Sequence, residues 1–294
     1  MVCFHPVDDE AAAWAIPGSG AVAMSRNRRD PVGGNTRDAG RTTLNRVFAV
    51  LEAFTVEAPS LSLTEVADGA GLPMATAHRI IAELVAWGAL ERLPDGRYHV
   101  GLRLWEVGSL APRRRDLRTG ALPFMQDLYE ATHENVQLAV RDGAQALILE
   151  SLSGPRSVGT VTEVGGRLPL HATGVGKVIL AWSEPELTHS VVEEGLPRYT
   201  PHTITAAGRL VGGLARVRSE HVAYSLEEMT LGAVSVAAPV LGPGGTLRAA
   251  LAIVVRSGTD LRRYTPAVRA AALGIARRLP VDGSAPTGAA SARR

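Results

Sequence analysis

Thr76, His78 and Arg79 place a hydroxyl, an imidazole and a guanidinium group within about one turn of a predicted helix. At 100° per residue, a helix that buries the apolar positions of this segment turns Ala75 and Arg79 to the opposite face, with Thr76 and His78 beside them. One long cation between small residues suits a helix that enters a major groove, where Arg79 can fork onto a guanine edge or hold a phosphate. The alternative is an ordinary amphipathic helix whose arginine is only solvated.

The segment before this helix carries the signals of a shorter helix and a tight turn. Ser62-Leu63-Thr64-Glu65 fits a capping box, in which the serine hydroxyl accepts from the amide three residues on and the glutamate accepts from the serine amide. Gly71 is expected to end the short helix in a left-handed conformation. Pro73 then begins the longer helix, where its missing N–H costs nothing, and Gly88 ends it. Helix, turn and helix in this order predict a helix-turn-helix.

A hairpin follows the longer helix. Pro94-Asp95-Gly96 is a turn signal between two short strands. In the second strand, Tyr98 and Val100 share one face and are expected to pack inward, whereas Arg97 and His99 share the other. A cationic hairpin face beside DNA clamps phosphates, although the same pattern is equally typical of a solvated edge strand. The whole module is therefore predicted to be a winged helix-turn-helix.

The composition limits the class of protein. A chain of 294 residues with 46% hydrophobic residues has room for two folded domains. Its formal net charge of +2 is small, so any affinity for nucleic acid must come from local clusters of arginine. The single cysteine, Cys3, excludes a disulfide framework and favours a reducing, cytoplasmic compartment. No run approaches the ~18 apolar residues of a membrane helix, and acidic residues at positions 8–10 argue against a signal peptide.

Helical spacing recurs on both sides of the module. A first helix is predicted from the apolar residues Leu44, Val47, Phe48, Leu51 and Phe54. After the hairpin, residues 102–110 are expected to form a helix that is broken by Pro112 and the arginine run after it. Residues 117–128 then space another helix, which tolerates Pro123 or kinks there.

Beyond Asn135 the pattern changes to strands. Arg141-Asp142-Gly143 joins two of them in a hairpin, and residues 234–240 and 247–255 are expected to be buried strands. Residues 265–279 close the pattern as an amphipathic helix with Thr265 as its cap. This mixture indicates an α+β sheet domain rather than a wound parallel one.

The expected organisation is a disordered N-terminal tail, a DNA-binding domain, a linker helix, an effector-binding domain and a disordered C-terminal tail, over residues 1–40, 41–101, 102–116, 117–280 and 281–294. The N-terminal tail is rich in Gly, Ala, Arg and Asp and has no periodicity. Met24 within it is a second candidate for the natural start.

A glycine-flanked helix start lies between Ala172 and Gly176, and the helix is predicted to run to Trp182. Free main-chain amides and a positive dipole at such a start can hold a carboxylate, although a plain strand-to-helix turn is the alternative. Lys177, the chain's one lysine, lies one turn inside, where it forms a surface ion pair or neighbours a ligand. The Glu227-Glu228 pair is expected to be exposed, with at most one side chain pointing into a pocket.

Several motifs recur in one order across both domains: Leu61 to Ala67 (LSLTEVA), Gly71-Leu72-Pro73, Thr76-Ala77-His78-Arg79, Tyr98-His99-Val100-Gly101, Leu168 to Lys177 (LPLHATGVGK), Glu227-Glu228 and Ser235 to Pro239 (SVAAP). With these motifs the chain resembles the IclR family of bacterial transcriptional regulators from about Thr43 to Leu279. The resemblance implies a winged helix, a linker helix and a ligand-sensing domain with a GAF-like fold. It also implies homodimers or tetramers, held partly through the winged helix and linker helix, that bind double-stranded operator DNA and a small-molecule effector.

The residues and the resemblance together give the candidate sites. DNA contacts are expected from Ser62, Thr64, Met74, Ala75, Thr76, His78, Arg79, Arg97 and His99. The effector is expected beside His171, Ala172, Thr173, Gly174, Ser225, Ser235, Ala252 and Val254. No catalytic residue, metal or cofactor is expected. Met74 and Ala75 stand where relatives often carry polar residues that touch phosphate, which weakens the expected grip of this helix start.

Members of the family that bind small polar acids carry an acid near Ser225, a cysteine near Ser235 and two serines on the last strand. Here Ala252 and Val254 occupy those two serine positions. A small hydroxy or keto acid would be left with unpaired polar groups, at about 1–3 kcal/mol each. The hypothesis is therefore a larger or more apolar effector, such as an aromatic or aliphatic acid.

Two other classes of function stay open in the sequence. An enzyme could use the second domain, but the chain has no Gly-x-Ser-x-Gly elbow, no His-Glu-x-x-His and no phosphate-binding loop. His171, His202 and His221 lack the tight spacing of metal ligands. A sensor could also dimerise without binding DNA. The leading expectation is a non-enzymatic, ligand-responsive regulator whose effector changes the spacing of two winged helices through the linker helix.

Overall fold

The computed structural model describes residues 42–279, apart from residues 56–57, 156 and 160–162, and only the main chain of residues 112–115. The expectations for residues 1–40 and 281–294, with Cys3 and Met24, lie outside this part of the chain. Within it, no helix is both long enough and apolar enough to cross a membrane.

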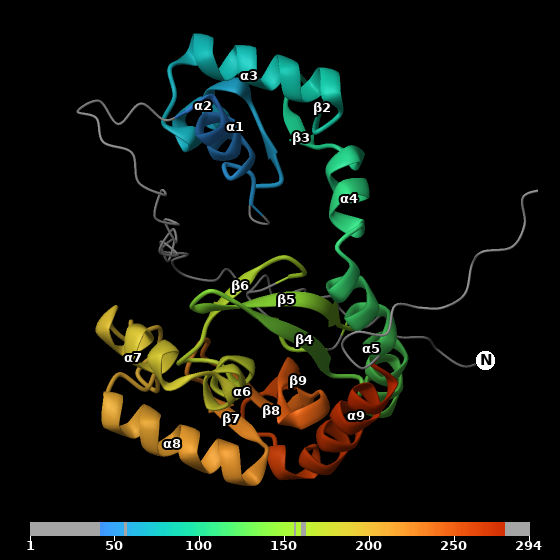
Figure 1. The fold of residues 1–294 in the computed structure, drawn as a ribbon, viewed down its shortest axis with the longest axis vertical. Helices are drawn as coiled ribbons and strands as arrows, with labels where there is room; N and C mark the ends of the chain where they lie inside the picture. Colours follow the sequence, from blue (N-terminus) through green and yellow to red (C-terminus); the bar gives the residue numbers. More distant parts are fainter. Residues whose placement is uncertain (1–41, 56–57, 156, 160–162, 280–294) are drawn as a thin grey trace, which may run out of the picture. The chain divides into compact units, whose positions relative to one another are not determined.

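The first folded part is a small domain of helices and a three-stranded antiparallel sheet, drawn in blue and cyan in Figure 1. Its elements are α1 (Thr43–Leu51), β1 (Ser60–Leu61), α2 (Leu63–Ala70), α3 (Met74–Trp87), β2 (Leu90–Arg92) and β3 (Tyr98–Val100). Strand β3 pairs with both β1 and β2. The predicted winged helix-turn-helix is confirmed, and β1 is an addition that is too short to show any periodicity in sequence.

The predicted boundary signals of this domain are present as hydrogen bonds and backbone angles. Ser62 Oγ accepts from the Glu65 amide at 3.3 Å, and Glu65 Oε2 accepts from the Ser62 amide at 2.7 Å. Gly71 and Gly88 end α2 and α3 at φ 62° and 86°, and Gly96 turns the hairpin at φ 87°. These left-handed angles favour glycine because it has no Cβ.

Helix α1 ends at Leu51, so Phe54 lies beyond the helix that it was expected to join. Val50 is completely buried in the core of the domain, together with Ile81 and Leu90. Leu44 and Phe48, by contrast, are 65% and 55% exposed. The outer face of α1 is therefore apolar.

Two helices follow the hairpin, α4 (Leu102–Ser109) and α5 (Pro112–Thr132). The helix that begins at Leu102 ends before Pro112, as expected. The next helix, however, begins at Pro112 and not near Leu117, so the arginines after Pro112 lie within α5. Proline has no N–H to donate, and the first turn of a helix does not need one. Helix α5 also continues through Pro123.

The second folded part is built on a six-stranded antiparallel sheet with the strand order β6-β5-β4-β9-β8-β7. The strands are β4 (Asn135–Asp142), β5 (Gln145–Leu152), β6 (Arg167–Pro169), β7 (Ala223–Leu226), β8 (Ala233–Leu241) and β9 (Leu247–Arg256). The helices are α6 (Gly174–Trp182), α7 (Pro185–Glu193), α8 (Ala207–Glu220) and α9 (Thr265–Arg278), with short 3₁₀ turns at Pro243–Gly245 and Leu261–Arg263. The predicted α+β class is confirmed.

Helices cover both faces of this sheet, as Figure 1 shows. One face packs against α5 and α9 around Met125, Leu251 and Ile275. The other packs against α6, α7 and α8 around Ile179 and Leu210. Side chains on successive strand positions alternate between these two cores, because residues i and i+2 of a strand share a face.

Thr265 does not cap α9, contrary to expectation. Its hydroxyl lies within 3.3 Å of the Leu261 carbonyl, to which it donates, and 2.9 Å from the Tyr224 hydroxyl. Tyr224 belongs to β7, so this threonine joins the helix start to the sheet instead of satisfying the first helical amides.

Helix α6 lies unusually close to the segment that leads into it. A Cβ added to Gly176 would stand 2.4 Å from the Leu170 carbonyl oxygen and 2.5 Å from the Leu170 Cα. A main chain in the interior cannot move aside as a flexible side chain does, so only glycine fits here.

Gly176→Ala should therefore lower the free energy of unfolding by about 1–3 kcal/mol, because the methyl group overpacks a site walled by backbone. Urea denaturation followed by circular dichroism measures the change. Gly212→Ala is the matched control: Gly212 lies on exposed α8 with nothing within 4 Å of its Cβ position, so alanine should stabilise by about 0.5–1 kcal/mol. Equal stability of Gly176→Ala and wild type would show that α6 can shift away from Leu170.

Candidate functional site

The exposed face of α3 carries most of the candidate DNA-binding residues. Met74, Ala75, His78 and Arg79 are exposed, and Thr76 is half-buried, whereas Ala77 is buried. Among the residues that the structure describes, Arg79 makes no hydrogen bond or ion pair, so its guanidinium is available to a partner. Pro73 gives α3 no side-chain cap, which leaves the amides of Met74 and Ala75 open at the positive end of the helix.

Arg97, the cation expected on the hairpin face, is already paired within the domain. Arg97 Nη2 lies 2.9 Å from Glu65 Oε2 and donates to the Ser60 carbonyl at 2.7 Å, while Nε donates to Ser60 Oγ at 3.3 Å. The pKa of Glu65 is lowered, first by its bond from the Ser62 amide and also by Arg97. Arg97 therefore fastens β1, α2 and β3 together within the domain.

The rest of the hairpin shows the same internal pairing. His99 Nε2 lies 3.7 Å from Glu91 Oε2, and its Nδ1 lies 3.0 Å from the Val100 carbonyl. Tyr98 is buried as expected, but Val100 is 46% exposed. Val100 stands beyond the end of β1, which pairs only with Tyr98 and His99, so no third strand covers it.

The second domain contains a pocket between the start of α6, the sheet, and the loop that joins β7 to β8. Its lining is mostly apolar with a few polar groups: Gln137, Gly159, Leu168, Thr173, Gly174, Val175, Ser225, Met229, Thr230, Ala233, Val234, Ser235, Ala252 and Val254. Ser225, Ser235 and Val254 are register partners on β7, β8 and β9, and Gln137 pairs with Ala252 one row along. Each row places its side chains on one face of the sheet, which forms the floor.

The start of α6 closes one end of this pocket. Thr173 caps the helix, because its Oγ1 accepts from the Gly176 amide at 3.1 Å and its carbonyl accepts from the Lys177 amide at 3.0 Å. The amides of Gly174 and Val175, both in the pocket wall, remain for a ligand. A Cβ on Gly174 would stand 2.8 Å from Ser235 Oγ, so glycine allows the helix start to lie directly on the floor.

Most of the candidate effector residues meet at this pocket. Thr173, Gly174, Ser225, Ser235, Ala252 and Val254 line it. His171 and Ala172 do not: the His171 ring is buried against Tyr199 with Nε2 3.0 Å from the Pro197 carbonyl, and burial lowers its pKa. The Ala172 carbonyl accepts from Ser225 Oγ at 3.1 Å. Both residues therefore hold the turn before α6 in place through contacts outside the pocket.

Sequence reasoning missed three pocket residues with distinct chemistry. Met229 and Thr230 lie on the loop after β7, which has no periodicity to signal its position. Gln137 is 4% exposed and lines the pocket from β4. A lone glutamine between Val136 and Leu138 in a buried strand was the available signal, because a polar side chain in such a strand needs a partner.

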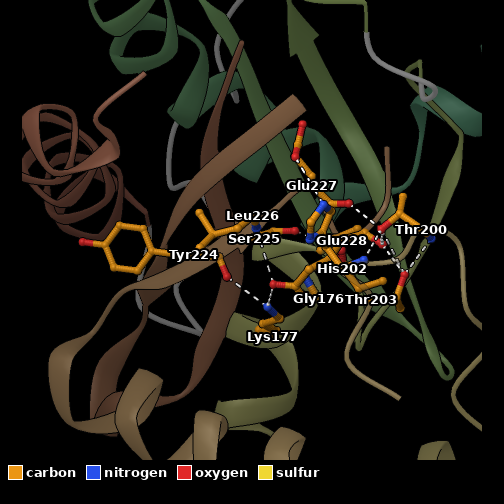
Figure 2. A network of polar contacts seen from close by, with 12 residues as sticks. Gly176, Lys177, Thr200, His202, Thr203, Tyr224, Ser225, Leu226, Glu227 and Glu228 are labelled. Atoms are coloured by element: carbon orange, nitrogen blue, oxygen red, sulfur yellow. Dashed lines mark hydrogen bonds and ion pairs between the residues drawn. The ribbon is translucent and has the colours of Figure 1, made fainter. Parts of the chain in front are cut away.

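Lys177 and Glu228 were expected at the surface or beside a ligand, and both expectations of exposure were wrong. Each side chain is nearly completely buried, at 6% residue exposure, and Lys177 Nζ lies 2.5 Å from Glu228 Oε1 (Figure 2). Burial lowers the pKa of Lys177, against the opposing effect of the Glu228 charge. Glu227 and Glu228 follow the end of β7, and Glu227 has a left-handed φ of 55°, so strand alternation does not apply to them.

Among the residues that the structure describes, no group of three or more His, Cys, Asp or Glu side chains is arranged to hold a metal ion.

Comparison with known proteins agrees with both parts of the fold. Residues 110–279 match the family described as "Bacterial transcriptional regulator IclR C-terminal", and residues 43–94 match the "IclR helix-turn-helix domain". The HTH-type transcriptional regulator XynR of Escherichia coli is 28% identical over 81% of this chain and 96% of its own. The HTH-type transcriptional repressor AllR of Salmonella typhi is 31% identical over 74% of this chain and 81% of its own.

A solved structure is similar along nearly its whole length. It is an IclR homolog from Microbacterium hydrocarbonoxydans complexed with 4-hydroxybenzoate, 34% identical, with a TM-score of 0.78 over 81% of this chain and 99% of the homolog. The two folded parts thus define a DNA-binding transcriptional regulator that responds to a ligand. The chain belongs to the IclR family of bacterial transcriptional regulators, and the resemblance read from its motifs is confirmed.

Two neighbouring hydroxyls at the start of α2 test whether the capping box stabilises the winged helix. Ser62→Ala should destabilise the winged helix by about 1 kcal/mol, because it removes the acceptor for the Glu65 amide. Thr64→Ala deletes an exposed hydroxyl next to it and should stay within about 0.5 kcal/mol of wild type. Thermal unfolding of both variants measures this; equal losses would mean that the capping box contributes little.

Proposed function

We propose that α3 reads operator DNA, with Arg79 as its base- or phosphate-contacting cation and the amides of Met74 and Ala75 as phosphate donors. The observation that carries this is a free guanidinium on an exposed face flanked by the small side chains of Ala75 and Ala82. Small flanking residues let a helix lie deep in the major groove. Main-chain amides at the positive end of α3 substitute for the polar side chains that Met74 and Ala75 lack.

We infer that the effector is an acid with an apolar body. The carboxylate would accept from the free amides of Gly174 and Val175, where the α6 dipole favours an anion. Leu168, Met229 and Val254 supply an apolar surround, and among the residues that the structure describes no lysine or arginine lines the pocket. The 4-hydroxybenzoate complex of the Microbacterium homolog supports an aromatic acid.

Gln137 extends this proposal to the far end of the pocket. It lies on β4, two strands from Ser235 on β8, so about 10 Å of sheet separates the two backbones. Its amide makes no hydrogen bond to the residues that the structure describes, and it lines the pocket, so a bound ligand that gives this amide no partner loses about 1–3 kcal/mol. A hydroxyl opposite the carboxylate of an aromatic acid would satisfy it.

Self-association follows from apolar surface on the first domain and its neighbouring helix. Leu44 and Phe48 on α1, Trp87 on α3, and the α4 residues Leu102, Trp105 and Val107 are all exposed. A monomer rarely exposes so many large apolar side chains, so we propose that they are covered in a homodimer. Effector binding would then bias the arrangement of the two winged helices through α4 and change the match to paired half-sites on DNA.

The second domain is proposed to act by binding alone, without chemical turnover, in the reducing interior of the cell. A nucleophile would need an adjacent base, and the described residues of the pocket lining include no histidine, cysteine, aspartate or glutamate. Chromatography of an aromatic acid incubated with the protein tests this directly, and any product formed in proportion to protein would overturn it.

Arg79→Ala should weaken binding to DNA from upstream of the protein's own gene by about 1–3 kcal/mol, which is roughly fivefold to 150-fold. Fluorescence anisotropy with a salt titration and a scrambled duplex measures both affinity and sequence preference. Arg209→Ala, an exposed arginine on α8, is the matched control and should bind as wild type does. Equal affinities for Arg79→Ala and wild type on both duplexes would contradict the role of Arg79 as the DNA-contacting cation of α3.

Calorimetry should show 4-hydroxybenzoate binding more tightly than benzoate, and both more tightly than glyoxylate or pyruvate. Gln137→Leu should abolish the preference for the hydroxyl, a change of about 1–3 kcal/mol, because leucine needs no partner. Tight binding of glyoxylate or pyruvate would contradict the apolar pocket. A hydroxyl preference that survives in Gln137→Leu would assign its recognition to another residue.

A further inference from the structure

The buried Lys177–Glu228 pair joins the two sides of the effector pocket. Lys177 follows Gly174 and Val175 on α6, which line the pocket, while Glu228 precedes Met229 and Thr230 on the loop after β7, which also line it. Neither Lys177 nor Glu228 lines the pocket itself. The two charges therefore connect the pocket walls from outside.

The same pair also contacts the free edge of the sheet. β7 is an edge strand, and in Figure 2 Lys177 reaches across to it. Lys177 Nζ donates to the Tyr224 carbonyl at 2.9 Å, and Glu228 Oε1 accepts from the Leu226 amide at 3.4 Å. The pair thus provides the hydrogen-bonding partners that another strand would give to Tyr224 and Leu226, and it fixes α6 against the edge of the sheet.

A second set of bonds holds the glutamates from the other side. Thr203 Oγ1 donates to the Glu228 carbonyl at 2.7 Å, and Thr200 Oγ1 donates to the Glu227 carbonyl at 2.6 Å (Figure 2). Glu227 Oε1 accepts from the Gly232 amide at 2.7 Å. The main chain on both sides of Met229 and Thr230 is therefore fixed, and the Lys177–Glu228 contact sets where this loop stands relative to α6.

Stability alone does not explain the pair. A buried ion pair recovers its desolvation cost only when every polar atom is satisfied, and apolar replacements are often as stable. Glu228 Oε2 is buried with no hydrogen-bond partner in the described part of the chain. What the pair provides and an apolar contact cannot is a directional bond from Lys177 to both Glu228 and Tyr224.

We propose that Lys177 and Glu228 are positioning residues of the effector site, which set the separation between the Gly174–Val175 amides and the Met229–Thr230 wall. This rests on the proposed effector function. Lys177 is not the counter-ion of the effector acid, because its charge is balanced by Glu228 and directed at β7. Effector affinity then depends on the pair beyond its contribution to folding.

The test compares variants of the full-length protein by calorimetry with 4-hydroxybenzoate. Glu228→Gln, which keeps the shape and removes the charge, should weaken binding by about tenfold or more through a loosened site. If Lys177 were the counter-ion instead, freeing its charge would tighten the binding of the acid and overturn the proposal. Glu184→Gln, which breaks the exposed Arg141–Glu184 pair, is the matched control and should bind as wild type does.

A double variant, Lys177→Met with Glu228→Met, separates positioning from folding. It removes both charges, so its unfolding midpoint should return towards wild type, as apolar replacements of buried pairs do. Binding should nevertheless stay weak, because methionine cannot hold Tyr224 and Leu226. Recovery of both stability and affinity in the double variant would show that the pair contributes to folding only and does not position the effector site.

Amide hydrogen exchange tests, without any ligand, whether the Lys177–Glu228 pair holds the two pocket segments in place. In Glu228→Gln and in the double variant, exchange should rise at residues 226–232 and at the start of α6, with β9 and the Glu184→Gln protein unchanged. Wild-type protection at both segments would overturn the proposal. If wild-type protein binds no aromatic acid, the effector proposal fails, and this exchange pattern alone decides whether the pair positions the two walls.

Discussion

The close contact between the start of α6 and the sheet is the constraint on which the second domain depends. Gly174 lies on Ser235, and Gly176 lies on the main chain of Leu170, at distances that exclude a Cβ. Because the start of α6 lies directly against the sheet, its first amides face the floor of the pocket instead of solvent. The same close packing places Lys177 beside the edge strand β7, where its Nζ donates to the Tyr224 carbonyl and to Glu228 Oε1. The free amides at the start of α6 and the buried ion pair thus both result from this close packing.

The first domain is organised around a shared carboxylate. Glu65 accepts from the Ser62 amide at the start of α2 and pairs with Arg97 on the hairpin, so one side chain joins the helix start to the wing. Arg97 is thereby held within the domain, whereas Arg79 on α3 makes no hydrogen bond or ion pair to the described residues. In the proposed complex with DNA, a helix start that is already joined to the hairpin would need little further ordering, which lowers the entropic cost of binding.

Features that depend on neighbours in the sequence were predictable, and those that depend on sheet order were not. The capping box, the left-handed glycines and the α+β class each have a local signature, and each is present. Pro112 shows the limit of such signatures. Proline is common both just after the end of one helix and in the first turn of the next, so the sequence does not tell where the second helix begins. Gln137 and Met229 converge through a strand order that no local pattern states. The expected exposure of Glu228 failed for the same reason, since its partner lies 51 residues away.

The burial of Lys177 has a consequence for the chemistry of the whole chain. It is the only lysine in the sequence, so the folded protein keeps its one side-chain amine out of water. Acylating reagents, aldehydes and lysine-modifying enzymes all need an accessible, unprotonated amine, and here they meet it only when α6 parts from β7. Covalent modification of this nitrogen therefore reports on the separation of α6 from β7 at a single position, and no reactive residue has to be engineered.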